Sequence, residues 1–345
     1  MRSKLKPVAD QTIVVTGATS GIGLATARLA AQRGAALILV ARNKRALDDT
    51  ARKFEAAGAR CVVCVADVAS EADVQRIVST AIENFGGFDS WINNAAAATY
   101  GPIEQIPLED QSRIFNVNYN GTLMGSLAAL THFRQRGGAG AIVNMGSVLS
   151  DRAMIYQGPY SATKAAVQSA TDALRMEVER EGLPVSITLI KPAAINSPYP
   201  EHARNYMDAP PRLPPPLYDP SLVADAILFS CETPRRHLYV GGGGYLISLA
   251  GRFAPRLTDK AMQAVGVQIQ QKPGDPGDRA KRDNLEQPKR DGAVHGDQDV
   301  FVRQTSVLLQ AQKQPLLVPF VAAAAAIEIA QGVADYFRSE EKQHG

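Results

Sequence analysis

The sequence predicts an α/β fold in which a doubly wound parallel sheet is covered by helices on both faces. Short apolar runs alternate with helical patterns through about the first 240 residues. Several runs are continuously apolar, such as Ile13-Val14-Val15 and Leu37-Ile38-Leu39-Val40, as expected for parallel strands buried on both sides. Alternating β and α elements favour this architecture over a sandwich or a helical bundle.

The individual elements follow from the same patterns. Gly34 and Gly58 each follow a helical pattern and are expected to end it. Ser70 is expected to cap a further helix that runs to about Phe85. The expected strands are Thr12–Thr16, Leu37–Ala41, Cys61–Ala66, Ser90–Asn93, Ala141–Asn144, Val185–Ile190 and Leu238–Val240.

Composition excludes several classes of protein. The 345 residues carry a formal net charge of +3, too small to indicate nucleic acid as a partner. Three Cys cannot form a disulfide framework, and the five His never fall at zinc-ligand spacing, so no metal site is predicted. Residues Met1–Pro7 have no apolar run after their basic residues, unlike a secretory signal. We therefore expect a cytoplasmic protein.

A glycine-rich turn joins the first expected strand to the first expected helix. Glycines allow a tight turn close to a pyrophosphate, and the helix N-terminus supplies free N–H groups and partial positive charge. The position between strand and helix favours dinucleotide binding over a merely structural turn. The residues predicted to bind are Gly17, Ser20, Gly21, Ile22 and Gly23.

The end of the second expected strand predicts which dinucleotide binds. Sites that select NAD usually place an acidic residue here for the ribose 2′-OH, whereas an Arg accommodates the 2′-phosphate of NADP. Arg42 is present, with Lys44 and Arg45 nearby, and the acid is absent. We expect NADP (NADPH) rather than NAD; the alternative is that Arg42 is a solvated surface charge.

Tyr160 and Lys164 are predicted to form the chemical centre. They lie four residues apart in a helical stretch that reaches about Glu181, so they share one helix face. A free Tyr has a pKa of about 10, and a nearby ammonium should lower that pKa toward neutrality. Ser147 precedes this pair after a strand and loop.

These motifs together resemble the short-chain dehydrogenase/reductase family, in its single-domain Rossmann branch. The resemblance covers about residues 8–245. The segments that carry it are Thr16-Gly17-Ala18-Thr19-Ser20-Gly21-Ile22-Gly23, Asn93-Asn94-Ala95-Ala96, Asn118, Ser147 and Tyr160-Ser161-Ala162-Thr163-Lys164, in the family's order.

The resemblance implies roles for the matching residues. Tyr160 would exchange a proton with the substrate oxygen, Ser147 would stabilise that oxygen, and Lys164 would hold the nicotinamide ribose. Asn118 would anchor a water in a proton relay. The resemblance also implies a homo-oligomer. The further cofactor-binding residues that it implies are Asp67, Val68, Asn94, Ala95, Pro192 and Ile195.

Two departures from the family pattern bear on the substrate. Ala96 stands where the fourth-strand motif usually ends in Gly, and Ala193 follows Pro192 where the family has Pro-Gly. Further along the chain, Ser197 occupies the position where the family pattern has a Thr. The extra methyl groups are expected to narrow the pocket near the nicotinamide rather than to abolish activity.

The chain is longer than the family's catalytic domain. We expect residues 1–250 to form that domain, with a Pro-rich substrate lid at about 193–220. An amphipathic segment (251–271), a disordered linker (272–304) and an apolar helical tail (305–345) should follow. The interpretations of the tail are a spanning helix, or an amphipathic helix on a partner subunit, on the catalytic domain or in weak peripheral contact with a membrane.

The predicted activity is hydride transfer between NADP(H) and a small-molecule carbonyl or secondary alcohol. One alternative is a dinucleotide-binding regulatory or scaffold protein without catalysis, which would not need Asn118, Ser147, Tyr160 and Lys164 together. A second is a nucleotide-sugar epimerase or dehydratase. The glycine spacing and the lack of a large second substrate domain disfavour it.

Overall fold

The computed structural model describes residues 4–277, 283–289, 291–314, 323 and 327. Its centre is a seven-stranded parallel sheet in the order β10-β7-β6-β4-β1-β2-β3. The expected strands are all present in it, with ends moved by two residues at most. They are β1 (Thr12–Thr16), β2 (Ala36–Ala41), β3 (Cys61–Val65), β4 (Ser90–Asn93), β6 (Gly140–Met145), β7 (Val185–Pro192) and β10 (His237–Val240).

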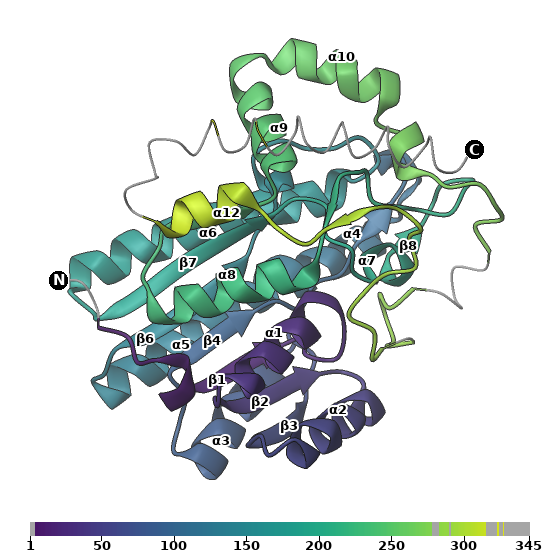
Figure 1. Cartoon of the computed structure of the whole chain (residues 1–345). Helices are drawn as coiled ribbons and strands as arrows, with labels where there is room; N and C mark the ends of the chain where they lie inside the picture. Colours follow the sequence, from purple (N-terminus) through teal and green to yellow (C-terminus); the bar gives the residue numbers. More distant parts are fainter. Residues whose placement is uncertain (1–3, 278–282, 290, 315–322, 324–326, 328–345) are drawn as a thin grey trace.

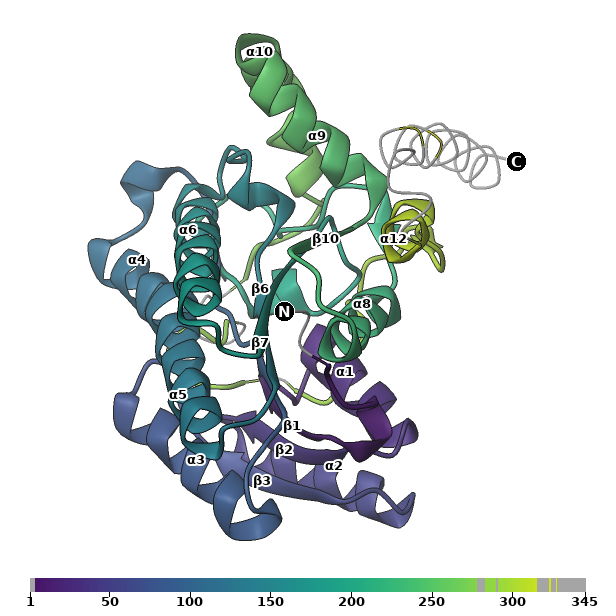
Figure 2. The same ribbon diagram turned by 90° about the vertical axis from the view of Figure 1, so that its left-hand side faces the viewer.

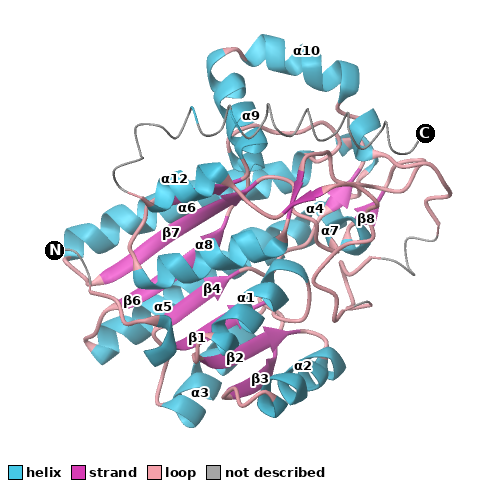
Figure 3. Ribbon diagram, viewed as in Figure 1, coloured by secondary structure: helices cyan, strands magenta, loops and turns pink. Residues whose placement is uncertain are grey.

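Helices cover both faces of this sheet, as Figure 2 and Figure 3 show. Successive strand residues point to opposite faces, so Ile13 and Val15 of β1 pack into one core and Val14 into the other. On one side lie α1 (Gly21–Gln32), α2 (Lys44–Ala56) and α8 (Pro220–Glu232). On the other lie α3 (Glu71–Phe85), α4 (Leu108–Phe115), α5 (Gly121–Arg136) and α6 (Gly158–Glu181).

The predicted limits of α3 are confirmed. Ser70 is the N-cap of α3, and its hydroxyl accepts a hydrogen bond from the N–H of Asp73 at 3.3 Å. The helix ends at Phe85, where Gly86 turns the chain with a φ of 74°.

The strand order fixes where a ligand can bind. β1 is hydrogen-bonded to β2 on one side and to β4 on the other. The connections after β1 and β4 therefore leave in opposite directions and open a crevice at the carboxyl ends of the strands. The glycine-rich turn and the end of β4 face this crevice.

Smaller elements surround the crevice. The 3₁₀ turns are η1 (Val8–Asp10), η2 (Ile103–Gln105), η4 (Val148–Ser150) and η5 (Gln268–Gln270), and η3 (Asn116–Asn120) is one π-helical turn. The expected lid holds α7 (Tyr199–His202), β8 (Arg204–Asn205) and β9 (Leu217–Tyr218). β8 pairs with β5 (Thr99–Tyr100).

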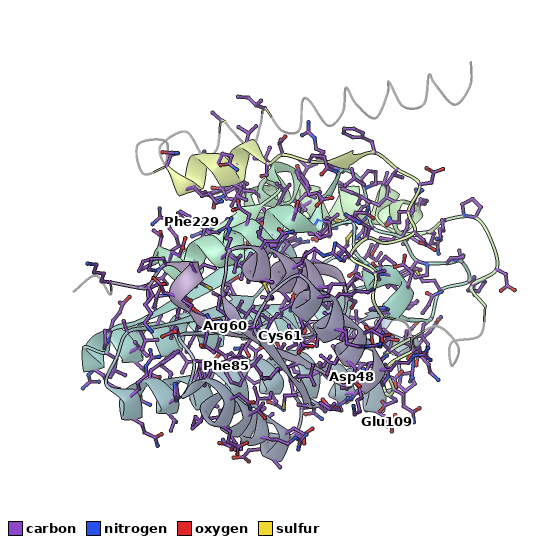
Figure 4. The ribbon with its side chains drawn as sticks, turned by 60° about the horizontal axis from the view of Figure 1, so that its bottom comes forward. Asp48, Arg60, Cys61, Phe85, Glu109 and Phe229 are labelled. Carbon is purple, nitrogen blue, oxygen red and sulfur yellow. The ribbon has the colours of Figure 1, made fainter. Side chains whose placement is uncertain are left out.

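The C-terminal extension packs on the catalytic domain through most of its described length. α9 (Gly242–Phe253) and α10 (Pro255–Val265) project beyond the sheet in Figures 1 and 2. β11 (Val302–Arg303) pairs with β9 in the lid, and α12 (Val307–Lys313) lies along α8 and β10. Figure 4 shows Phe229 of α8 next to α12, where the Lys313 ammonium lies 5.2 Å from its ring centroid.

The expectation of a disordered linker needs correction. Residues 283–289 and 291–304 are not a free linker, because backbone carbonyls and Asp side chains hold them against the catalytic domain. Composition gave no hint of this, since the segment has almost no aliphatic residues.

The apolar tail is described only at its start. Leu308 and Leu309 of α12 are buried, and the rest of the tail, apart from residues 323 and 327, lies outside the described residues, as does its expected membrane contact. Within the part of the chain that the structure describes, no helix is both long and apolar enough to cross a bilayer.

Candidate active site

The glycine-rich turn lies between β1 and α1 and has no room for side chains at two positions. A Cβ on Gly23 would lie 2.0 Å from the carbonyl oxygen of Gly17, so the first turn of α1 packs directly on the turn. Gly17 itself has a φ of 69°, which favours glycine. Ser20 is the N-cap of α1 but makes no capping bond with its side chain. The Ser20 side chain therefore leaves the N–H groups of this helix terminus uncapped.

The end of β4 closes the other side of this turn. Asn94 donates from its side-chain amide to the carbonyl oxygen of Thr16 at 2.9 Å. The hydroxyl of Thr16 accepts from the N–H groups of Asn94 and Ala95 at 2.9 and 3.1 Å. These bonds hold the ends of β1 and β4 together at the crevice.

Arg42, Asp67 and Val68 lie at the ends of β2 and β3 and line the same cavity. The side chain of Asp67 is paired with Arg113 at 2.5 Å. Burial lowers the pKa of Arg42 from its ordinary value, with the charge of Asp67 acting in the opposite direction. This end of the cavity therefore carries the charged groups expected for the adenosine half of a dinucleotide.

Ser147 and Tyr160 reach the opposite half of the cavity from β6 and α6. Ser147 is the N-cap of η4, where its hydroxyl accepts from the N–H of Leu149 at 3.0 Å. Tyr160 and Lys164 share one face of α6, and the ammonium lies 5.5 Å from the centroid of the Tyr160 ring. Lys164 also donates to the carbonyl oxygen of Met145 at 2.8 Å.

The π-helical turn η3 places Asn118 behind this group. Its side-chain oxygen accepts from the N–H of Ala97 at 2.7 Å. Its amide donates to the carbonyl oxygen of Ala97 and to the hydroxyl of Thr163, which precedes Lys164 on α6. Asn118 thus ties the segment after β4 to the helix that carries Tyr160.

Burial dominates the protonation of the central pair. It raises the pKa of Tyr160 well above its ordinary value, and a hydrogen bond with Ser147 acts in the opposite direction. It lowers the pKa of Lys164 to about 8. Burial, which raises the Tyr160 pKa, is therefore the largest influence on this group, in place of the lowering by the ammonium that we expected.

The glycine-rich turn, the strand ends and the Tyr160 and Lys164 side chains line one cavity of about 530 Å³. It is lined by the predicted residues Gly17, Ser20, Gly21, Ile22, Arg42, Asp67, Val68, Asn94, Ala95, Ser147, Tyr160, Lys164, Pro192 and Ile195. The other two predicted residues lie behind its wall: Gly23 against Gly17, and Asn118 against Ala97 and Thr163.

Two further groups of residues at this cavity were not predicted from sequence. Tyr199 of the lid packs edge-on against Tyr160 with 5.3 Å between ring centroids, and its hydroxyl donates to Gln157 at 2.9 Å. Gln157 in turn donates to Gln270 of the extension at 2.7 Å. A lone Gln or a Tyr in a Pro-rich segment carries no recognisable motif.

The second group is the segment of residues 283–289 and 291–297, which we call the strap. Figure 1 shows it as yellow-green loops at the carboxyl ends of the strands. Asn284, Pro288 and Asp291 of the strap line the cavity opposite the predicted cofactor residues. Its charged composition indicates solvation, and only the three-dimensional structure shows these contacts.

Fold and cavity together are typical of a nucleotide-binding oxidoreductase with a Rossmann-type sheet. The family model described as short chain dehydrogenase matches residues 11–207, more than half of the chain. The chain belongs to the short-chain dehydrogenase/reductase family and acts on CH–OH and C=O groups.

Two relatives show the range of similarity. "Uncharacterized oxidoreductase YxnA" of Bacillus subtilis (strain 168) is 40% identical over 323 residues, which are 93% of this chain and 90% of the relative. "Diacetyl reductase [(S)-acetoin forming]" of Staphylococcus epidermidis (strain ATCC 12228 / FDA PCI 1200) is 32% identical over 177 residues, 51% of this chain and 69% of the relative. The first alignment spans too much of both chains to be confined to the catalytic domain.

Solved structures show the same fold. L-Sorbose reductase from Gluconobacter frateurii, in a complex with NADPH and L-sorbose, matches with a TM-score of 0.59 and 24% identity. The match covers 70% of this chain and 97% of that one. An alcohol dehydrogenase from Thermococcus sibiricus, complexed with 5-hydroxy-NADP, has a TM-score of 0.58 at 23% identity and covers 67% and 95%.

Proposed function

We propose that the chain reduces a carbonyl compound, or oxidises the corresponding secondary alcohol, with NADP(H) and with Tyr160 as the general acid/base. The observation that carries this proposal is the convergence of Ser147, Tyr160 and Lys164 on one cavity whose other half is the glycine-rich turn. The nicotinamide ring, when bound, would supply or accept the hydride.

Side chains of the protein would bind the substrate oxygen and transfer its proton. Tyr160 would donate its proton to the substrate oxygen as that oxygen gains charge, and Ser147 would stabilise it by a hydrogen bond. Lys164 is the residue that would hold the ribose hydroxyls. Asn118 would keep α6 and the segment after β4 in register through Ala97.

The raised pKa of Tyr160 favours reduction at neutral pH. A neutral phenol is a proton donor, whereas oxidation of an alcohol needs the phenolate as a base. Burial keeps Tyr160 protonated well above neutrality. Tyr160 is therefore in the protonated form that carbonyl reduction needs at pH 7.

Replacing Tyr160 with Phe tests the chemical assignment. Y160F removes the hydroxyl but keeps the ring that packs on Tyr199, so the cavity should keep its shape. We expect turnover to fall by about 100-fold or more, the usual scale of general acid–base catalysis, while NADPH affinity is kept. Turnover would be measured from NADPH absorbance and affinity from NADPH fluorescence. Wild-type turnover in Y160F would refute the role of Tyr160.

The preference for NADP(H) rests on Arg42 and on the absence of an acid at the end of β2. We expect wild type to bind NADPH at least about tenfold more tightly than NADH, since a bidentate phosphate contact exceeds 1.4 kcal/mol. Arg42→Leu should remove this difference. Fluorescence titration of both dinucleotides measures it, and equal affinities in wild type would contradict the preference.

The substrate half of the cavity favours an apolar compound. Of the charged lining residues, Arg42, Asp67 and Asp291 lie at the adenosine end, and Lys164 lies beside Tyr160. The walls near Ser147 are Val148, Leu149, Met154, Ala193, Leu213, Pro214, Pro215, Pro216, Ile247, Met262 and Ile269. We propose an uncharged carbonyl compound with an apolar body. A panel of apolar ketones and aldehydes, matched with carboxylated analogues, would test this, and faster turnover of the carboxylated series would contradict it.

The other expectations from sequence remain predictions. A homo-oligomer, a cytoplasmic location and a peripheral membrane contact are tested by nothing in the described residues.

A further inference from the structure

The strap occupies the donors that the adenosine phosphates of a dinucleotide would need. The Arg42 guanidinium donates from Nη1 to the carbonyl oxygens of Leu285 and Glu286 at 3.1 and 2.9 Å. Its Nη2 donates to the carbonyl oxygen of Asn284. Both terminal nitrogens of Arg42 therefore serve backbone oxygens of the same chain.

The glycine-rich turn is engaged in the same way. The N–H of Gly21 donates to the carbonyl oxygen of Ala293 at 2.9 Å. The hydroxyl of Thr19 donates to the Asp291 carboxylate at 3.1 Å, and the carbonyl oxygen of Thr19 accepts from the N–H of Gly292 at 2.8 Å. A carboxylate and a carbonyl thus lie where the turn and the helix N-terminus favour an anion.

The strap is also fastened to the substrate lid at both of its ends. At one end the buried Asp283 accepts two hydrogen bonds from Arg204 of β8, each 3.1 Å long. At the other end the N–H of Asp297 donates to Glu201 of α7 at 2.8 Å. Gly296 lies against Ser197, where an added Cβ would come within 2.7 Å of the Ser197 carbonyl oxygen. Strap and lid are therefore joined at both ends of the strap, and both contribute residues to the cavity lining.

We propose that the strap is an internal competitor for the 2′-phosphate end of NADP(H), and that its displacement also loosens the substrate lid. This rests on the proposed function, because it takes Arg42 as the 2′-phosphate group. A 2′-phosphate can reach both terminal nitrogens of Arg42 only after the three carbonyl oxygens of the strap have left. Cofactor affinity is then reduced by the fraction of molecules in which the strap is closed.

Hydrogen–deuterium exchange of the full-length protein tests the direction of this coupling. The N–H groups of Asn284, Gly292 and Asp297 are bonded to the lid and to the turn. Saturating NADPH should speed exchange in peptides covering 283–297, because those bonds must break. Slower or unchanged exchange in these peptides, while NADPH binds, would overturn the proposal and would instead describe a clamp over bound cofactor.

Substitutions in the strap test the competition itself. Asp283→Ala removes the anchor to Arg204, and Asp291→Asn weakens the contact with Thr19 without changing size. Each should lower the Kd for NADPH by about tenfold, the factor expected if roughly one molecule in ten is open. NADH, which lacks the 2′-phosphate, should gain less. Asp299→Ala is the matched control, because Asp299 is exposed in the same extension and should leave both Kd values unchanged.

The outcomes separate the two proposals. If both strap variants bind NADPH as wild type does, the strap is not a competitor and the proposed cofactor stands. If wild type and variants bind neither dinucleotide, the proposed function fails and the strap proposal fails with it. Tighter binding of NADPH by the strap variants, with the control unchanged, supports both.

Discussion

Asn118 couples two parts of the cavity wall through a single buried side chain. Its amide satisfies both the N–H and the carbonyl oxygen of Ala97 and also reaches Thr163. The π-helical turn η3 makes this possible, because widening the helix by one residue points Asn118 inward. Asn118 has a structural role here in addition to the role implied by family resemblance.

Removal of this side chain should therefore cost stability as well as activity. Asn118→Ala would leave the Ala97 N–H without its acceptor, and we expect a loss of about 1–3 kcal/mol in the free energy of unfolding. Urea denaturation measures this loss. Asn120→Ala is the control, since Asn120 lies in the same turn but is exposed and should change stability by less than about 0.5 kcal/mol. Equal losses in the two variants would contradict the argument.

Ala193 shows how a departure from the family pattern is accommodated. Its methyl group was expected to narrow the pocket. In the structure, Gly241 and Gly244 lie opposite it, and a Cβ on either would come within 2.8 Å of the Ala193 Cβ. The glycine run at the start of α9 thus makes room for the methyl group. The sequence shows both features, but only their spatial proximity connects them.

At the scale of elements, the lid and the strap meet at a pair of carboxyl groups. Burial, together with the neighbouring Asp297, raises the pKa of Glu201 to about 7. The Asp297 pKa is lowered by its hydrogen bond with Glu201 and by Lys272, 3.1 Å away. Tyr100, which interacts electrostatically with Glu201, is buried, and its raised pKa keeps it uncharged at neutral pH. The pair therefore holds one proton that the unfolded chain would release.

This pair makes the stability of the contact depend on pH. The folded pKa of Glu201 lies above its ordinary value of 4.5, so the folded state keeps a proton between about pH 4.5 and 7 that the unfolded chain has lost. Stability should therefore fall as pH rises through this window. Glu201→Gln cannot ionise and should raise Tm at pH 8 by roughly 2–4 °C, the shift given by about 1 kcal/mol in domains of 150–250 residues.

Thermal unfolding at pH 5 and pH 8 measures this effect. The gain from Glu201→Gln should be smaller at pH 5, where wild-type Glu201 is protonated in the folded state. Glu83→Gln removes an exposed carboxyl group on α3 and should show no such pH dependence. A gain from Glu201→Gln that is the same at both pH values would show that the carboxyl pair does not titrate in this window.

The elements that can be predicted from the sequence differ from the strap in the interactions that hold them in place. The strands β1 and β2 are continuously apolar, and burial alone identifies them. Tyr160 and Lys164 share a helix face, so their spacing predicts their proximity. The strap is held partly by carbonyl oxygens of Asn284 and Leu285, which every residue type possesses, and partly by Asp side chains whose partners lie far away in the sequence, so its contacts follow no local sequence pattern.

At the scale of the whole molecule, helix α12 of the extension binds the edge of the sheet at β10. β10 is an edge strand with unpaired backbone groups. Gln312 of α12 accepts from the N–H of Tyr239 and donates to its carbonyl oxygen, at 2.9 and 2.8 Å. Leu309 is fully buried in the same core as β1 and α8. Helix α12 therefore packs as part of the catalytic domain and not as a separate tail.

Because α12 packs in the same core as the sheet, we expect α12 and the sheet to unfold together. Leu309→Ala should lower the free energy of unfolding by about 2–5 kcal/mol through lost burial and a residual cavity. Trp91, the one Trp of the chain, lies in β4 and packs on Phe88 in the core on the opposite face of the sheet. Its fluorescence therefore reports on a region remote from α12. If the chain unfolds as one unit, Trp91 fluorescence and far-UV circular dichroism should move together in Leu309→Ala.

A matched variant isolates the effect of burial within the same helix. Val307 begins α12 and is 37% exposed, so Val307→Ala should shift the transition much less than Leu309→Ala does. A separate early change in circular dichroism, with the Trp91 transition unmoved, would show that α12 docks as an independent element. Coincident shifts would instead mean that α12 shares the stability of the catalytic sheet and stays docked while the strap opens. Opening of the strap would then be a local event within a folded molecule, as competition with a cofactor requires.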